Sequence, residues 1–241
     1  MKFLICSCSH GHLANKDACN DLLKFKADYK PDVTVHAGDF IDAGAFMGNG
    51  KGSETPADNI WNDISDGLEF VRRLEPNVLF CGNHEDRLWK IKESTNEVKA
   101  WAASTVIDKL ESFARQIGAE LVEYGSMSDP SSYRRLGPLA VGHGWSFGKN
   151  AEQEHAQMTG QPTAIGHVHR MQSMPAYGFS APPGYSVGCL CDIPKMTYAK
   201  NRKATAGWTN GFAYGEFSET EYTLILKRIG QWKPAQIKSV V

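Results

Sequence analysis

Five short apolar runs in this chain each end at a loop that carries a histidine, an aspartate or an asparagine. The five loops are, in order, Cys8-Ser9-His10-Gly11, Gly38-Asp39-Phe40-Ile41-Asp42, Gly82-Asn83-His84-Glu85, Gly142-His143 and Gly166-His167-Val168-His169. Short apolar runs rich in β-branched or aromatic residues predict buried strands. Strands of an α/β sheet deliver the residues that follow them to one edge. We therefore expect these polar side chains to converge there.

Helical spacing of apolar residues separates the first strands and predicts an α/β fold. It recurs over residues 18–29, 60–71 and 106–117, and Gly118 is a predicted helix C-cap. The second half is richer in strands, with predicted long loops at Trp145–Gln161, Arg170–Gly184 and Ile193–Asn210. Because the sequence shows no internal repeat or linker, we expect a single domain over residues 1–241.

The composition argues against partners that bind through an extensive charged surface, such as nucleic acid or a membrane. The chain is 41% hydrophobic and 22% charged, with a net charge of −1, so it gives no global electrostatic case for nucleic acid or a membrane surface. No run approaches the roughly 18 apolar residues of a membrane span. The apolar N-terminal run is too short for a signal peptide, and the six cysteines lack the spacing of a disulfide framework. We expect a cytoplasmic protein with no membrane partner; the sequence does not indicate an oligomeric state.

The residues of the five loops match the needs of phosphoester hydrolysis. That reaction requires an activated water and neutralised phosphate oxygens, which two metal ions roughly 3.5–4 Å apart supply together. Such a site takes about four ligands per ion with one shared carboxylate. Here Asp39 is the candidate bridge, and the other candidate ligands fall into two sets, His10 with His169 and Asn83 with His143 and His167.

The order of these motifs resembles the calcineurin-like metallophosphoesterases. The family pattern is Asp-x-His, Gly-Asp-x-x-Asp, Gly-Asn-His-Asp/Glu, Gly-His and Gly-His-x-His, and the loops between residues 8 and 169 follow it. The resemblance implies a four-layer αββα sandwich of two mixed β-sheets flanked by helices. It also implies hydrolysis of phosphomonoesters or phosphodiesters by a metal-bound hydroxide. Residues 188–212 resemble the C-terminal part of phage-type members.

Carried over to this chain, the resemblance assigns roles to individual residues. Two divalent metal ions would be bound, the first by His10, Asp39 and His169. The second would be bound by Asp39, Asn83, His143 and His167. His84 would be the catalytic residue over the substrate phosphate, where it stabilises the transition state or protonates the leaving group.

Cys8 stands where the family has its first aspartate. A thiolate carries the same formal charge as a carboxylate and binds zinc at about 2.3 Å. As a softer ligand, it favours zinc or iron in the first site, with manganese or magnesium less favoured. The alternative is that Cys8 is an inert thiol and the first site is weakened or empty, in which case His12 could compensate as a ligand.

Residues beside the motifs allow supporting roles. We expect Asp42 to orient its neighbours rather than to bind metal. Glu85 or Asp86 could orient a ligand, or could simply favour the dipole of a helix N-terminus. Arg87 could reach a phosphate or be solvated. A four-cysteine zinc site built from the pairs 6/8 and 189/191 lacks the spacing of common zinc motifs.

Two other functions stay open from the sequence. A nuclease or nucleic-acid-end phosphatase is favoured by the phage-type resemblance and by one local basic and aromatic cluster. That cluster consists of Lys195, Tyr198, Lys200, Arg202, Lys203 and Trp208, which could track a nucleic-acid backbone and stack bases or form a solvated loop. A non-catalytic interaction protein is the third hypothesis, motivated by the missing aspartate.

Overall fold

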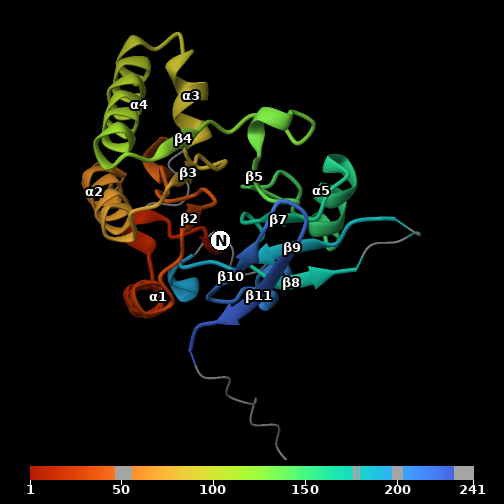
Figure 1. Ribbon diagram of the computed structural model, residues 1–241. Helices are drawn as coiled ribbons and strands as arrows, with labels where there is room; N and C mark the ends of the chain where they lie inside the picture. The colour runs from red at the N-terminus through yellow and green to blue at the C-terminus, as the bar shows by residue number, and fades with distance from the viewer. Residues whose placement is uncertain (47–55, 176–177, 179, 197–202, 231–241) are drawn as a thin grey trace, which may run out of the picture.

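Two β-sheets pack face to face in a computed structural model of the chain (Figure 1), which describes residues 1–46, 56–175, 178, 180–196 and 203–230. The main core lies between the sheets. Phe3, Ile5 and Phe80 come from one sheet, and Val141 and Val187 come from the other, all fully or almost fully buried. The predicted sandwich of two mixed sheets with flanking helices is confirmed.

The first sheet has six strands in the order β11-β10-β1-β2-β3-β4. Strands β1 to β4 run parallel, whereas β10 and β11 are antiparallel to their neighbours. Their bounds are β1 Lys2–Cys6, β2 Val33–His36, β3 Val78–Phe80, β4 Glu120–Val122, β10 Gly211–Phe217 and β11 Tyr222–Arg228.

The second sheet has five strands in the order β5-β6-β7-β9-β8, of which β6, β7 and β9 are mutually parallel. Their bounds are β5 Arg134–Leu136, β6 Leu139–Gly142, β7 Thr163–Ile165, β8 Met171–Met174 and β9 Gly184–Val187. Strand β5 was not predicted from the sequence, and β8 lies in Arg170–Gly184, which was predicted to be a loop. Both lie at an edge of the sheet and are only partly apolar, so they lack the buried runs that marked the other strands.

Helices cover the outer faces. Along the chain they are α1 Lys16–Tyr29, α2 Pro56–Leu74, α3 Asp86–Lys92, α4 Glu97–Ile117 and α5 Ala151–Thr159. Two apolar clusters join the first four helices to the first sheet, and α5 contacts the second sheet (Figure 1). Gly118 ends α4 in the left-handed conformation, at φ 70°, as predicted.

Helix α5 corrects one expectation. Residues 145–161 were predicted to be a loop, because the sequence of α5 is largely polar and shows little helical periodicity. In the structure five of its residues are nevertheless buried, among them His155. Packing against β7 and β9 therefore stabilises a helix that local sequence preference does not mark. Among the described residues, no helix is both long and apolar enough to cross a bilayer.

The topology explains why distant motifs meet. Strands β1, β2, β3, β6 and β7 each end within a few residues of one of the five polar loops. The parallel strands within each sheet carry their loops at one edge, and the 3.3 Å contact of His143 after β6 with Asp39 after β2 shows that these edges meet. The polar loops are consequently brought together over the junction of the two sheets.

Candidate metal centre

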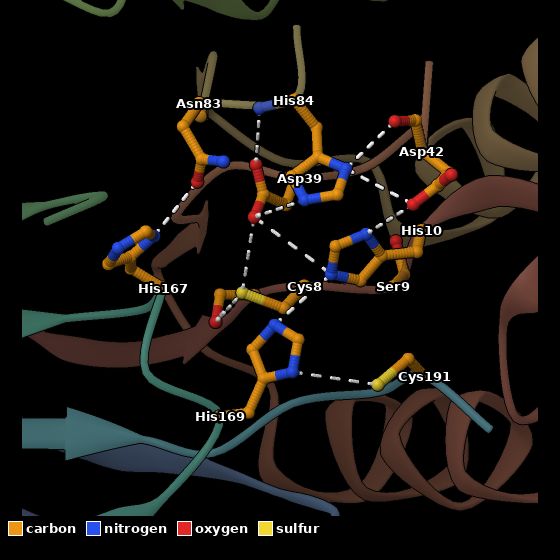
Figure 2. Close-up of polar contacts among 12 residues, drawn as sticks. Cys8, Ser9, His10, Asp39, Asp42, Asn83, His84, His167, His169 and Cys191 are labelled. Carbon is orange, nitrogen blue, oxygen red and sulfur yellow. Dashed lines mark hydrogen bonds and ion pairs between the residues drawn. The ribbon is translucent and has the colours of Figure 1, made fainter. Parts of the chain in front are cut away.

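Cys8, His10, Asp39 and His169 form the first cluster of this edge. One potential ligand atom from each lies within 4.8 Å of the others, and all four side chains are buried. Nε2 of His10 is 3.1 Å from Nε2 of His169 and 3.9 Å from Oδ2 of Asp39. The Sγ atom of Cys8 lies 4.0 Å from the same carboxylate oxygen (Figure 2). The structure therefore places Cys8 with the predicted ligands of the first metal.

Asp39, His143 and His167 form a second cluster on the same scale. Nε2 of His143 lies 3.3 Å from Oδ2 of Asp39. The side-chain oxygen of Asn83 lies 3.2 Å from that imidazole nitrogen and 2.8 Å from Nδ1 of His167. Asp39 thus stands between the two clusters, which is the position that a shared carboxylate requires.

The two clusters suit divalent cations. They gather carboxylate, amide and imidazole electron pairs, and Nε2 of His167 is buried with no hydrogen-bond partner among the described residues. Burial alone would raise the pKa of Asp39, but His143, His84 and His10 outweigh it and hold the pKa well below its usual range. Burial lowers the pKa of His167 to about 3. An ionised carboxylate and a neutral imidazole are the forms that bind a cation.

The thiol of Cys8, by contrast with Asp39 and His167, is not in the form that binds a cation. Burial, together with the charge of Asp39, raises the pKa of its thiol well above the ordinary value. Ser7 Oγ donates a hydrogen bond to Sγ at 3.3 Å, which favours the thiolate but does not outweigh burial. A metal-free Cys8 is consequently a neutral thiol, and it needs a cation close by to lose its proton.

Residues with positive φ are concentrated among these candidate ligands. Among the described residues, eight that are not glycine have a positive φ, and five of those belong to the two clusters. The five are Cys8, His10, Asp39, His167 and His169, with φ between 55° and 58°. Because the left-handed conformation is unfavourable for such residues, strain of this kind marks functional sites.

His84 lies beside the first cluster rather than in the second. Its Nε2 is 4.0 Å from Oδ2 of Asp39, and its Nδ1 is 2.8 Å from the backbone oxygen of Asp42. The Arg87 guanidinium donates to that same backbone oxygen at 2.7 Å and lies 3.3 Å from Nε2 of His84. His84 and Arg87 therefore form a polar group at the rim of the metal clusters.

A family model described as calcineurin-like phosphoesterase matches residues 1–171, which include all five polar loops. The chain belongs to the calcineurin-like phosphoesterase family. This confirms the resemblance at the level of the family, whereas the phage subtype stays a prediction. The search of the curated proteins gave no match.

Solved structures of the same general kind resemble this phosphoesterase distantly. A metallophosphoesterase from Sphaerobacter thermophilus is 16% identical, with a TM-score of 0.46 and coverage of 89% of this chain and 82% of the other. The phosphoesterase Yfce from E. coli is 13% identical, with a TM-score of 0.39 and coverage of 94% and 99%. Neither likeness carries an argument about substrate.

Glu85 has a role in the phosphoesterase that the sequence left open. Its carboxylate is buried and accepts hydrogen bonds from three backbone N–H groups, those of Asp39, Ile41 and Gly82, at 3.0, 2.9 and 2.7 Å. It therefore ties the loop that carries Asp39 to the loop that carries Asn83. Burial and the charge of Asp39 raise the pKa of Glu85 to about 7, so neutralising Asp39 with a cation would favour ionised Glu85.

The sequence analysis did not predict a role for Asp63. This residue of α2 is buried, and its carboxylate accepts the backbone N–H groups of Asp42 and Ala43 at 2.9 and 2.8 Å. Its Oδ1 lies 3.3 Å from Nδ1 of His12. His12 therefore pairs with α2 and is not part of either metal cluster, which argues against its role as a substitute ligand. The sequence offers no signal for Asp63, because its partners are backbone groups of a loop that is distant in sequence.

The basic and aromatic cluster of the phosphoesterase is only partly described. Tyr198, Lys200 and Arg202 lie outside the described residues, and so does the side chain of Lys203. Lys195 is paired with Asp192 at 3.0 Å. The ring of Trp208 packs against His169 with centroids 4.1 Å apart. The nucleic-acid hypothesis therefore stays a prediction from the sequence.

Proposed function

We propose that this chain is a dinuclear metal-dependent phosphoesterase that hydrolyses phosphomonoesters or phosphodiesters. The observation that carries the proposal is the position of Asp39, whose Oδ2 is within 4.0 Å of ligand atoms on both sides. Cys8, His10 and His169 would complete the first metal site. Asn83, His143 and His167 would complete the second.

The ions would supply an activated water and would neutralise the charge on the non-bridging phosphate oxygens. The rest of the chemistry falls to the protein. Glu85 and Asp63 hold the loops that carry Asp39 and Asp42, so the ligand geometry is fixed before substrate binds. A preorganised site of this kind avoids reorganisation during the reaction.

His84 is the proposed proton donor to the leaving group. Its Nδ1 faces two oxygen atoms of Asp42, so the proton on that nitrogen is held there. Nε2 is then the nitrogen that can exchange a proton with a substrate oxygen. The Arg87 guanidinium beside it would contact the same phosphate.

The test combines metal content with turnover. Protein purified without chelators should hold about two divalent ions per chain, measured by elemental mass spectrometry. It should hydrolyse a chromogenic phosphomonoester or phosphodiester. His143→Ala should lower both metal content and turnover. His12→Gln is the matched control, because this histidine lies beside the first cluster but pairs with Asp63.

The results of these measurements distinguish the enzyme from the interaction protein. Turnover that requires metal and is lost in His143→Ala, but not in His12→Gln, supports the proposal. Full metal loading without hydrolysis of any phosphoester tested would overturn it and would favour the interaction protein. The ligands retained around Asp39 argue for the enzyme.

A further inference from the structure

A second group of potential ligands lies behind the proposed dinuclear centre. Cys189 and Cys191 follow β9, and each Sγ lies within 4.8 Å of the other and of a ring nitrogen of His169. Both cysteines are 0% exposed. The four-cysteine site considered from the sequence does not form, because Cys6 packs in a separate cluster with Leu4 and Leu22.

The local backbone presents the two thiols on the same side. Residues two apart in an extended segment share a face, and the side chain between them points the other way. Cys189 and Cys191 accordingly lie in one buried cluster, whereas Leu190 packs in the cluster under α1. The amide of Asn210 donates to the backbone oxygens of Cys189 and Cys191 at 3.3 and 2.8 Å. The pair is thus held in place before any ligand binds.

His169 connects this pair to the first cluster through its two ring nitrogens. Nε2 faces Nε2 of His10 at 3.1 Å, and Nδ1 faces Sγ of Cys191 at 3.9 Å. Figure 2 shows His10 and Cys191 approaching different nitrogens of the ring. A histidine that binds metal usually directs its other nitrogen at a carboxylate, a carbonyl or water. Here that position is taken by a sulfur, which is itself a zinc ligand.

The distances suit a tetrahedral ion. Bonds of about 2.3 Å to sulfur and about 2.0 Å to nitrogen at a tetrahedral angle place these two ligands ~3.5 Å apart. The 3.9 Å between Cys191 Sγ and His169 Nδ1 is close to this value. The side-chain amide nitrogen of Asn210 also lies 3.7 Å from Sγ of Cys189. Soft thiolate donors select zinc over magnesium or manganese.

We propose that Cys189, Cys191 and His169 bind a further zinc ion, which shares the His169 imidazole with the first metal of the dinuclear centre. The sharing rests on the proposed function, whereas the thiolate site itself does not. Binding would release the two thiol protons and the remaining ring proton of His169 to solvent. Cys8 lies in the same buried cluster as Cys189 and Cys191.

The test compares metal content in two variants of the full chain reconstituted with zinc. The double variant Cys189→Ser/Cys191→Ser should bind about one ion fewer than the wild type. It should also lose most of the thiolate-to-metal charge-transfer absorption when cobalt replaces zinc. The control is Cys19→Ser, a buried thiol of α1 outside the cluster, which should change neither quantity.

The variants also separate this proposal from the proposed function. Ions lost in His143→Ala but fully retained in the double variant would overturn the thiolate site. Ions lost in the double variant but not in His143→Ala would support the thiolate site and overturn the dinuclear centre.

A measurement on the wild type tests the thiolate site independently if the double variant fails to fold. X-ray absorption at the zinc edge counts sulfur neighbours. Three thiolates, from Cys8, Cys189 and Cys191, shared among three ions give at least about one sulfur per zinc. A dinuclear centre with Cys8 alone gives about half a sulfur per zinc. The lower value would refute the thiolate site.

Discussion

Oδ1 of Asp42 lies 3.1 Å from Nδ1 of His84, and the same carboxylate oxygen lies 3.4 Å from Nδ1 of His10. One aspartate therefore orients both the proposed proton donor and a proposed metal ligand. Burial alone would lower the pKa of His84, but Asp39 and Asp42 outweigh it and raise the pKa above its ordinary value of 6.5. This arrangement makes His84 a competent acid near neutral pH.

Removing the imidazole of His84 should slow the reaction without emptying the site. His84→Ala is expected to lower turnover on the order of a hundredfold or more, because general acid catalysis is lost. Metal content should stay at the wild-type level, since His84 lies 4.0 Å from the nearest carboxylate oxygen of Asp39. Turnover and elemental analysis of the same preparation check both parts. Unchanged turnover would remove His84 from the chemistry.

Asp42 should set the pH at which that acid works. If protonated His84 is required, turnover falls as the pH rises through its pKa. Asp42→Asn removes a negative charge that raises this pKa, so the falling limb of the pH–rate profile should move to lower pH. The profile of kcat against pH for the two proteins measures the shift. A limb that stays in place would contradict the pairing of Asp42 with His84.

Cys8 should determine which metal activates the enzyme. Cys8→Asp replaces a soft ligand by a hard one, and activation of metal-free protein should shift from zinc toward manganese. Titration of turnover with each metal is the measurement. Cys19→Ser, a buried thiol remote from the clusters, controls for the loss of any thiol. Identical metal profiles for wild type and Cys8→Asp would mean that Cys8 is not a ligand.

Glu85 should matter for stability as well as for metal binding. In Glu85→Gln the amide NH₂ must face at least one of the three backbone N–H groups that the carboxylate accepts. An unpaired buried donor costs about 1–3 kcal/mol, so the free energy of unfolding in urea should fall by that amount. Asp86→Asn, one residue along and paired with the exposed Lys90, should change it little. Equal free energies of unfolding for Glu85→Gln and Asp86→Asn would argue against a role of Glu85 in joining the two loops.

His36 should make the metal-free fold sensitive to acid. Burial lowers its pKa to about 3, so the unfolded chain binds the proton first as the pH falls below 6.5. Its contribution to stability is complete above that pH and is lost between about 6.5 and 3, at up to ~1.4 kcal/mol per unit. Between pH 7 and pH 5 the wild type should lose about 2 kcal/mol more than His36→Gln. Equal decreases in the free energy of unfolding of the wild type and His36→Gln, measured in urea, would contradict the assignment of this pH dependence to His36.

Much of the fold was predictable because burial leaves a direct trace in the sequence. Strands such as Val33–His36 and Val78–Phe80 are apolar runs that end at glycine-containing loops, and parallel strands place those loops at one edge. Helix α5 and strand β8 leave no such trace, since tertiary contacts rather than local pattern stabilise them.

The candidate site was predictable only in part, for a related reason. Candidate ligands such as Asp39 and His169 belong to motifs whose residue types suit metal chemistry. The residues that support them are not set in this way. Glu85 falls in the Gly-Asn-His-Asp/Glu motif, although the motif does not show which groups its carboxylate contacts. Asp63 binds backbone N–H groups, which every sequence contains, and Cys191 meets His169 through the packing of the segment that follows β9. Neither kind of contact has a signature in one sequence.

The left-handed backbone of the five candidate ligand residues has a consequence for the stability of the metal-free protein. Each costs on the order of 1 kcal/mol, so the five together cost about as much as the low end of the roughly 5–15 kcal/mol by which a domain stays folded. A cation that binds only the folded chain offsets this cost by mass action. Removal of metal should therefore lower the free energy of unfolding. A molecule that loses its ions should therefore unfold more readily than one that holds them.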